Sequence, residues 1–358
     1  MPRGERLTYL PHRHPTRTPA PSGRPKTADD RRSSRYLITG GAGFIGSHLT
    51  DELLRRGHSV TVIDNLSTGR LQNITHLEGH SSFQFVRASI DDRLVLDRLA
   101  SEADVIVHLA AAVGVKLIVE HPVRTIETNV MGTEAVLKAA FRYGCRVLIA
   151  STSEVYGKGI RIPFGEDDDV VLGNTTRSRW AYATSKMLDE FLGLAYHREY
   201  GLPVVLCRLF NTVGPRQTSQ YGMVIPRLMG LALRGEPLTV FGDGTQSRCF
   251  CDVRDVVPAL LGLAEHPGSP GQVLNIGGTE EITILDLAER IRGVAGSAST
   301  IVFVPYDKAY APGFEDMQRR VPDVRRIQSL LGWRQEVSLD ETLGRVRDWL
   351  CQCPEESD

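Results

Sequence analysis

The chain of 358 residues is long enough for a sizeable core and more than one structural lobe, and its 41% hydrophobic and 24% charged residues are typical of a globular protein. A formal net charge of −1 offers no electrostatic footprint for nucleic acid or an anionic membrane, and no apolar run approaches the ~18 residues of a membrane span. We therefore expect neither nucleic acid nor a membrane as a partner.

The first 34 residues differ in composition from the rest of the chain. Residues 1–34 are rich in Pro and Arg and lack a hydrophobic period, which predicts a disordered tail. Six cysteines without a signal peptide indicate reduced thiols and a cytoplasmic protein rather than a disulfide scaffold. Cys249 and Cys251 form a C-x-C pair, but the second half of a zinc site is missing, so we predict no metal.

Residues 35–65 combine a strand, a glycine turn and a helix. Residues 36–39 are an apolar run, and Gly40, Gly43 and Gly46 follow at G-x-x-G-x-x-G spacing before apolar residues at helical intervals. Glycine at these positions lets backbone amides approach a pyrophosphate at the start of the helix. The segment therefore predicts a dinucleotide site.

Asp64 follows the next predicted strand, residues 59–63. A carboxylate at this place accepts hydrogen bonds from the ribose hydroxyls of adenosine and would repel a 2′-phosphate. The sequence therefore predicts NAD rather than NADP. The residues expected to line the NAD site are Gly40, Gly43, Phe44, Ile45, Gly46, Asp64, Asn65, Ser89, Ile90, Leu109, Ala110, Ala111, Tyr182 and Lys186.

Strand and helix patterns continue to alternate along the first half of the chain. Residues 82–90, 104–111 and 145–151 are predicted strands, and residues 125–144 show a helical pattern. This alternation predicts an α/β fold with a doubly wound parallel (Rossmann) sheet that binds its ligands at the carboxyl ends of the strands. The polar stretch at residues 151–154 would then border the cofactor crevice.

Residues 179–201 form a further helical pattern that contains Tyr182 and Lys186. Their i, i+4 spacing places both side chains on one face of the helix. An ammonium near a phenol stabilises the phenolate and lowers its pKa, so Tyr182 could act as a general base near neutral pH. The Y-x-x-x-K pattern is common by itself. The glycine turn and the hydroxyl-rich end of the strand at residues 145–151 make a catalytic role for it the favoured interpretation here.

These motifs resemble those of extended short-chain dehydrogenase/reductases of the nucleotide-sugar epimerase, dehydratase and decarboxylase group. The motifs that carry the resemblance, between about residues 35 and 350, are TGGAGFIG, HLAA, TNVMGT, STSEVYG, RLFNTVGPRQ, GDGTQSRCFCDVRDVV, NIGG and RRVPD. The resemblance implies an NAD-binding domain mainly at 35–208 and a tail at 351–358. It also implies a smaller C-terminal lobe, mainly at 209–350, which holds a nucleotide sugar. Some segments of this range are expected to pack back into the first domain. Family members oxidise the sugar C4 hydroxyl, with Tyr182 as the matching base and Thr152 on the same oxygen.

The strand tip bears on the fate of the resulting 4-keto sugar. The 4,6-dehydratases resemble TDEVYG, whose Asp acts as an acid, and Ser153 at that position cannot do so. Epimerases usually have Ser or Ala in place of Glu154. STSEVYG is similar to UDP-glucuronate decarboxylases, which implies catalytic roles for Thr152, Ser153 and Glu154. It also implies UDP-glucuronate as substrate and UDP-xylose or the 4-keto pentose as product.

Further polar residues match positions that contact substrate in those decarboxylases. The resemblance implies that Arg179 contacts the sugar and that Arg320 reaches the active site, to hold the uronate carboxylate or to serve as an acid. It also implies that Arg248 and Asn211 contact the diphosphate, for which a guanidinium fork is well suited. Ser89 is a departure, because the family usually has an Asp there on adenine.

Three other functions remain open, and a nucleotide-sugar dehydratase is the one that Ser153 counts against. A UDP-sugar 4-epimerase is another, since the AAVGV stretch also occurs in epimerase-like members. The loop that follows this stretch contains Lys116 and Glu120, whose roles are open. A redox-sensing protein that binds NAD without catalysis is the third, and the presence of Thr152, Tyr182 and Lys186 counts against it.

The resemblance also implies a homodimer. Family members pair through two helices per subunit in a four-helix bundle, and the matching helices are at residues 123–143 and 182–200. The second helix carries apolar residues that could form such contacts, although burial within one subunit explains them equally well; they are Phe191, Leu192, Leu194 and Ala195.

Overall fold

The computed structural model describes residues 33–112, 122–219, 223–309 and 317–353. The tail predicted at residues 1–34 lies almost wholly outside this part of the chain, and so does the loop with Lys116 and Glu120.

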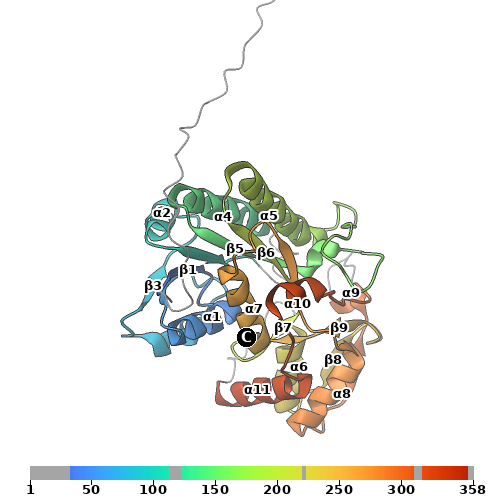
Figure 1. Cartoon of the computed structure of the whole chain (residues 1–358). Helices are drawn as coiled ribbons and strands as arrows, with labels where there is room; N and C mark the ends of the chain where they lie inside the picture. Colours follow the sequence, from blue (N-terminus) through green and yellow to red (C-terminus); the bar gives the residue numbers. More distant parts are fainter. Residues whose placement is uncertain (1–32, 113–121, 220–222, 310–316, 354–358) are drawn as a thin grey trace, which may run out of the picture. The chain divides into compact units, whose positions relative to one another are not determined.

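A seven-stranded parallel sheet forms the centre of the described structure (Figure 1). In the order β11-β6-β5-β4-β1-β2-β3 its strands run at Val273–Ile276, Val204–Leu209, Arg146–Thr152, Val105–His108, Arg35–Thr39, Ser59–Asp64 and Phe83–Arg87. β1 pairs on one side with β2, where Leu37 lies opposite Thr61, and on the other with β4, where Leu37 lies opposite Ile106. The chain thus changes direction across the sheet between β1 and β4. Such a switch point opens a crevice at the carboxyl ends of the strands.

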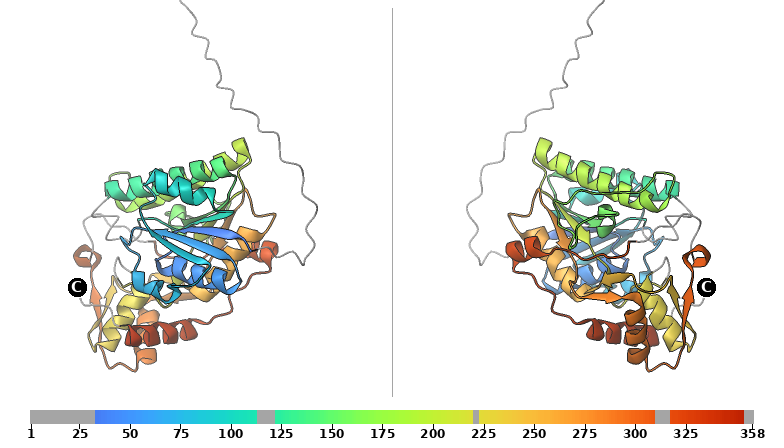
Figure 2. Two further views of the ribbon diagram at one scale, coloured as in Figure 1. Left: turned by 90° about the vertical axis from the view of Figure 1, so that its left-hand side faces the viewer. Right: turned by 90° about the vertical axis from the view of Figure 1, so that its right-hand side faces the viewer.

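Helices cover both faces of this sheet, as the side views in Figure 2 show. One face carries α1 (Phe44–Arg55), α7 (Val253–Glu265) and α10 (Arg325–Leu331), and the other carries α2 (Arg93–Ser101), α4 (Pro122–Tyr143) and α5 (Arg179–Tyr200). Separate apolar cores fill the two sides, because the central strands bury residues of both faces. α1 starts immediately after the glycine turn, and its start therefore lies at the crevice.

A second group of elements surrounds its own apolar core. This group comprises α6 (Val224–Leu233), α8 (Ile284–Ala295), α11 (Leu339–Gln352), β8 (Leu238–Phe241), β9 (Ser247–Cys249), β12 (Glu281–Thr283) and β13 (Ile301–Val304). β8 pairs with β13, and β9 pairs with β12. β7 (Thr212–Val213) and β10 (Cys251–Asp252) form another short parallel pair, and α9 spans Tyr306–Ala309.

The predicted fold class is confirmed, because the alternating patterns form a parallel sheet with helices on both faces. The predicted strand at residues 82–90 is shorter in the structure, where β3 spans Phe83–Arg87. β11 joins the main sheet from the range assigned to the second lobe, and the division at residue 208 stays a prediction. None of the helices in the described ranges is long and apolar enough to cross a membrane.

Candidate active site

One cavity of about 560 Å³ lies at the carboxyl ends of the central strands and is also lined by the second group of elements. Twenty of the residues predicted for the site line it: Gly40, Gly43, Phe44, Ile45, Gly46, Asp64, Asn65, Ser89, Ile90, Leu109, Ala110, Ala111, Thr152, Ser153, Glu154, Tyr182, Lys186, Asn211, Arg248 and Arg320. The side chain of Arg179 lies outside the described part of the structure, so its contact stays a prediction.

The glycine turn has no room for side chains. A Cβ on Gly46 would lie 2.4 Å from the carbonyl oxygen of Gly40, and one on Gly40 would lie 2.8 Å from the amide nitrogen of Ala110. Gly40 also has a φ of +72°, which favours glycine. No side chain caps the N-terminus of α1, whose N-cap is Gly43. The first amides of the helix therefore suit a diphosphate.

Asp64 forms the other polar anchor of this half of the cavity. Its carboxylate accepts hydrogen bonds from the backbone N–H groups of Ala42 (3.0 Å) and Leu66 (2.8 Å). Burial raises the pKa of Asp64, and these two hydrogen bonds oppose that shift. The turn and this carboxylate thus fit the phosphates and a ribose of NAD.

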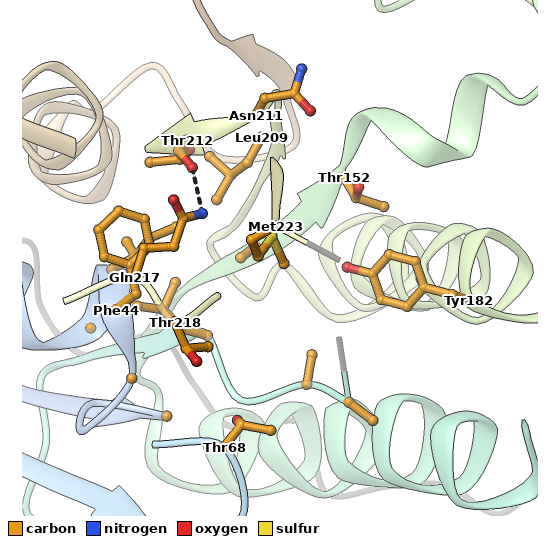
Figure 3. Close-up of a pocket in the computed structure, with 18 of the residues that line it drawn as sticks. Phe44, Thr68, Thr152, Tyr182, Leu209, Asn211, Thr212, Gln217, Thr218 and Met223 are labelled. Atoms are coloured by element: carbon orange, nitrogen blue, oxygen red, sulfur yellow. Dashed lines mark hydrogen bonds between the residues drawn. The ribbon is translucent and has the colours of Figure 1, made fainter. Parts of the chain in front are cut away.

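Tyr182 and Thr152 face the same end of the cavity from different elements. Figure 3 shows Tyr182 entering from α5 and Thr152 from the end of β5, on the side away from Phe44. The Thr152 hydroxyl accepts a hydrogen bond from the backbone N–H of Glu154 at 3.2 Å, which begins the short 3₁₀ helix Ser153–Tyr156. Tyr182 is only 7% exposed. The phenol is therefore shielded on most sides, apart from the cavity it lines.

Asn129 on α4 fixes the start of α5 relative to β4. Its side-chain oxygen accepts the backbone N–H of Ala112 (2.8 Å), and its amide donates to the hydroxyl of Ser185 (3.0 Å). Ser185 in turn donates to the carbonyl oxygen of Tyr182 at 2.8 Å. We did not predict a role for Asn129, although it belongs to the TNVMGT motif.

An ion pair lies just after the end of β5, next to the Ser153 hydroxyl. The Arg320 guanidinium lies 3.0 Å from the Glu154 carboxylate, with side chains only 9% and 13% exposed. A second nitrogen of Arg320 lies 3.5 Å from the Ser153 hydroxyl, at the limit of a hydrogen bond. The cavity wall thus presents a cation and an anion side by side.

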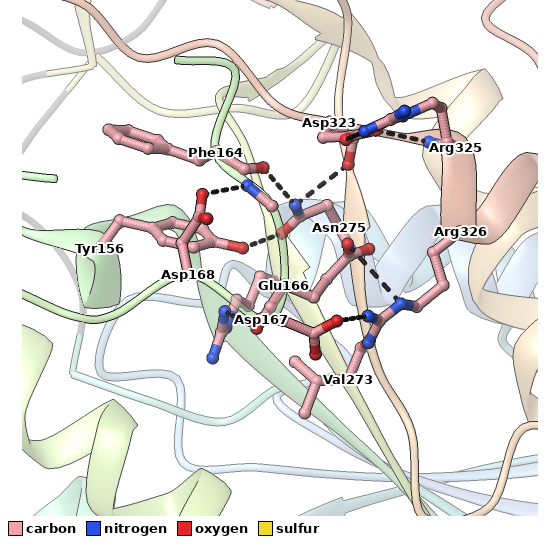
Figure 4. Close-up of polar contacts among 12 residues, drawn as sticks. Tyr156, Phe164, Glu166, Asp167, Asp168, Val273, Asn275, Asp323, Arg325 and Arg326 are labelled. Atoms are coloured by element: carbon pink, nitrogen blue, oxygen red, sulfur yellow. Dashed lines mark hydrogen bonds and ion pairs between the residues drawn. The ribbon is translucent and has the colours of Figure 1, made fainter. Parts of the chain in front are cut away.

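Asn275 of β11 joins the segment after Arg320 to the strand tip (Figure 4). Its amide donates to the carbonyl oxygens of Phe164 (2.9 Å) and Asp323 (3.1 Å), and its oxygen accepts the Tyr156 hydroxyl (2.8 Å). Backbone bonds from Phe164 to Val321 (2.8 Å) and from Asp323 to Phe164 (2.9 Å) complete the junction. The position of Arg320 against Glu154 is therefore set by a buried polar junction.

Asn211 lies between β6 and β7, and Arg248 lies on β9. The Asn211 amide donates to the carbonyl oxygen of Cys249 at 2.8 Å, and Arg248 donates to that of Ser247 at 2.7 Å. Arg248 is only 8% exposed and lines the cavity, and its contact with a diphosphate stays a prediction. Further cations that we did not predict also line the cavity: Arg70, Arg124, Arg216 and Arg227.

Comparisons with known proteins agree with this geometry. The family model for the NAD dependent epimerase/dehydratase family matches residues 36–277. A UDP-N-acetyl-alpha-D-glucosaminuronate decarboxylase from Bacillus cytotoxicus is 43% identical over 316 residues, which cover 88% of this chain and 97% of the relative. UDP-glucuronic acid decarboxylase 1 from Danio rerio is 40% identical over 322 residues, or 90% of this chain and 73% of the relative.

Among solved structures, the UDP-glucuronic acid 4-epimerase from Bacillus cereus, in complex with UDP-glucuronic acid and NAD, is similar to this fold. It is 32% identical with a TM-score of 0.80, covering 89% of this chain and 99% of that one.

The chain belongs to the NAD-dependent epimerase/dehydratase family. The predicted cofactor, NAD, is confirmed by this membership and by relatives solved with NAD. The roles given to single residues in this family member stay predictions, because only their position around one cavity is established.

The turn of this epimerase/dehydratase family member gives a direct test of the NAD site. We expect Gly46→Ala to weaken NAD binding about ten-fold or more, since its Cβ would collide with the Gly40 carbonyl and shift the turn. Titration calorimetry with NAD measures the effect. Gly344→Ala in α11 is the control, because its Cβ meets no atom within 4 Å and should leave affinity unchanged. Equal NAD affinity in both variants would contradict the binding of NAD at this glycine turn.

Proposed function

We propose that this protein is an NAD-dependent decarboxylase of UDP-glucuronic acid, which oxidises C4 to a 4-keto sugar and yields UDP-xylose, the UDP-4-keto-pentose, or both. The observation that carries this proposal is the Arg320–Glu154 ion pair in the cavity that also contains Tyr182 and Thr152. The relatives named as UDP-uronate decarboxylases, at about 40% identity over most of the chain, support it.

The oxidation step uses the hydroxyls of the strand tip and of α5. Tyr182, as phenolate, accepts the proton of the C4 hydroxyl, and Thr152 holds the same oxygen by a hydrogen bond. NAD supplies the hydride acceptor for C4 and the hydride donor where UDP-xylose is the product. The cavity wall shields this exchange from bulk water, since Tyr182 and Thr152 are both at most 9% exposed.

Decarboxylation follows from the position of the new ketone. The C6 carboxylate is then β to the C4 carbonyl, so the C5–C6 bond breaks, carbon dioxide leaves and the electron pair forms a C4 enolate. Thr152 and protonated Tyr182 stabilise the enolate oxygen, and protonation at C5 gives the 4-keto pentose. Glu154 relays that proton, and Arg320 orients the carboxylate before it leaves.

A second substrate and a second reaction are favoured by specific relatives. The 43% identical relative acts on an N-acetylated uronate, and a solved structure with 32% identity is a UDP-glucuronic acid 4-epimerase. Both substrates carry the C6 carboxylate that the ion pair would meet. They differ at C2, and the epimerase differs in returning the hydride to the other face without loss of carbon.

Incubation of the purified protein with NAD and each UDP-uronate separates these functions. We expect carbon dioxide and a pentose nucleotide from UDP-glucuronate, detected by mass spectrometry. Faster turnover of UDP-N-acetylglucosaminuronate would favour the N-acetylated substrate, and UDP-galacturonate would favour the epimerase. Absence of turnover with both uronates would overturn the proposed function.

We further propose a cytoplasmic homodimer that pairs through α4 and α5. These helices pack on each other and present exposed apolar side chains, among them Phe191, which is 60% exposed. Leu192 and Leu194 instead pack against the core of their own subunit, so Phe191 is the better candidate for a dimer contact. A monomer mass in sedimentation at micromolar concentration would contradict this pairing.

A further inference from the structure

The lysine that follows Tyr182 is paired with a buried carboxylate. The Lys186 ammonium donates to an Asp189 oxygen at 2.7 Å, and the two side chains are only 3% and 0% exposed. Tyr182, Lys186 and Asp189 lie on α5 at positions i, i+4 and i+7, and hence on one face of the helix. The cation next to the proposed base therefore has its counter-ion built into the same helix.

Burial and the polar neighbours of Asp189 shift its pKa in opposite directions. Burial raises the pKa of Asp189, and the charge and hydrogen bond of Lys186, with a hydrogen bond from Thr133, oppose that shift. Thr133 also contacts His108 Nε2 (3.0 Å), and His108 Nδ1 contacts the Thr39 hydroxyl (2.7 Å). A chain of buried hydrogen bonds thus runs from Thr39 on β1 through His108 to Thr133 on α4.

The other titratable groups around this pair are neutral or already paired. Burial lowers the pKa of His108 to about 3, so this ring is uncharged in the working range. Glu190, the next residue on α5, forms its own buried pair with Arg208 of β6 at 2.7 Å. Asp189 is therefore the carboxylate that balances the charge of Lys186.

We propose that Asp189 is a positioning residue of the reaction, which holds the Lys186 ammonium in place and sets the pH range in which Tyr182 accepts a proton. The carboxylate cancels part of the positive field that would otherwise act on the phenol. This inference rests on the proposed function, because it assigns a role within the same site.

Asp189→Asn tests the electrostatic part of the proposal. Removal of a buried negative charge makes the local potential more positive, which lowers the pKa of both the Tyr182 phenol and the Lys186 ammonium. Both limbs of the kcat/KM profile should therefore move to lower pH, by about one unit or more. Asp189→Glu keeps the charge and should keep the limbs in place. Asp97→Asn, which removes a partly exposed ion-pair partner of Arg142, is the matched control and should leave the profile unchanged.

A merely structural role of Asp189 gives a different result. Activity of Asp189→Asn would then fall at every pH, with the limbs unmoved, and the proposal would be overturned. The same conclusion would follow if Asp189→Glu and Asp189→Asn displaced the profile equally.

A stability cycle tests the pairing without any substrate. Lys186→Met and Asp189→Asn each leave one buried polar partner behind, so each should lower Tm by several degrees, and the double variant should recover most of the loss. If Asp189→Asn does not fold but the double variant does, the carboxylate is needed to balance Lys186. If the double variant also fails to fold, or if the two losses simply add, the pairing is refuted. Coupling in this cycle without turnover of a UDP-uronate would refute the proposed function but keep the pairing.

Discussion

Tyr182→Phe should lower kcat by on the order of 10³-fold and leave NAD binding intact. The change removes the phenol oxygen that is proposed to accept the C4 proton, and it keeps the aromatic ring. Because Tyr182 is 7% exposed and lines the cavity, the ring should stay in place. Carbon dioxide release under saturating UDP-glucuronate measures the loss, and calorimetric titration with NAD measures what is retained.

Tyr200→Phe is the matched control for this change. Tyr200 lies on the same helix, is 51% exposed and contacts Phe141 on α4, away from the cavity. Its variant should keep the wild-type rate. A Tyr182→Phe enzyme with a rate near that of the control would show that another group takes the proton. Loss of NAD binding together with turnover would instead indicate that the hydroxyl supports the cofactor.

The parts of the site that could be predicted are those that follow from local sequence. The glycine turn, Asp64 and the Tyr182–Lys186 spacing each lie within one strand, turn or helix. Their geometry therefore follows from the known geometry of that single element. Parallel strands then bring their carboxyl ends to one edge, which is why residues at or just after the ends of β1, β2, β4 and β5 line one cavity.

The parts that could not be predicted depend on pairs far apart in the chain. Asn275 meets Tyr156 across 119 positions, and Asn129 meets Ser185 across 56. No period or spacing links such residues, and the motifs that contain the asparagines gave no hint of their partners. Asp189 is a different case, since it lies three positions after Lys186. Its negative charge on a helix could equally have been a solvated one, and only its burial shows otherwise.

Arg320→Met should lower the rate of carbon dioxide release by about 10²- to 10³-fold, the usual loss when a charged group that orients or stabilises the reacting centre is removed. Methionine keeps an unbranched apolar side chain but removes the charge, so under the proposed mechanism the uronate carboxylate would lose its cation and lie beside Glu154 alone. KM for UDP-glucuronate should rise as well, since the like charges of Glu154 and the substrate then repel each other. Steady-state kinetics with UDP-glucuronate gives both values.

Arg319→Ala separates this effect from a general change in charge. Arg319 precedes Arg320 in the chain, is 54% exposed in its side chain and pairs with Glu281 at 2.7 Å, so its removal alters the net charge equally but leaves the ion pair at Glu154 intact. Its variant should keep a rate close to that of the wild type. If the two variants had the same kcat and KM, Arg320 would serve only to balance Glu154, and the orientation of the uronate would have to come from another cation of the cavity, such as Arg124. In that case Arg320→Met combined with Glu154→Gln should be as stable as the wild type, because neither charge would be left buried without its partner.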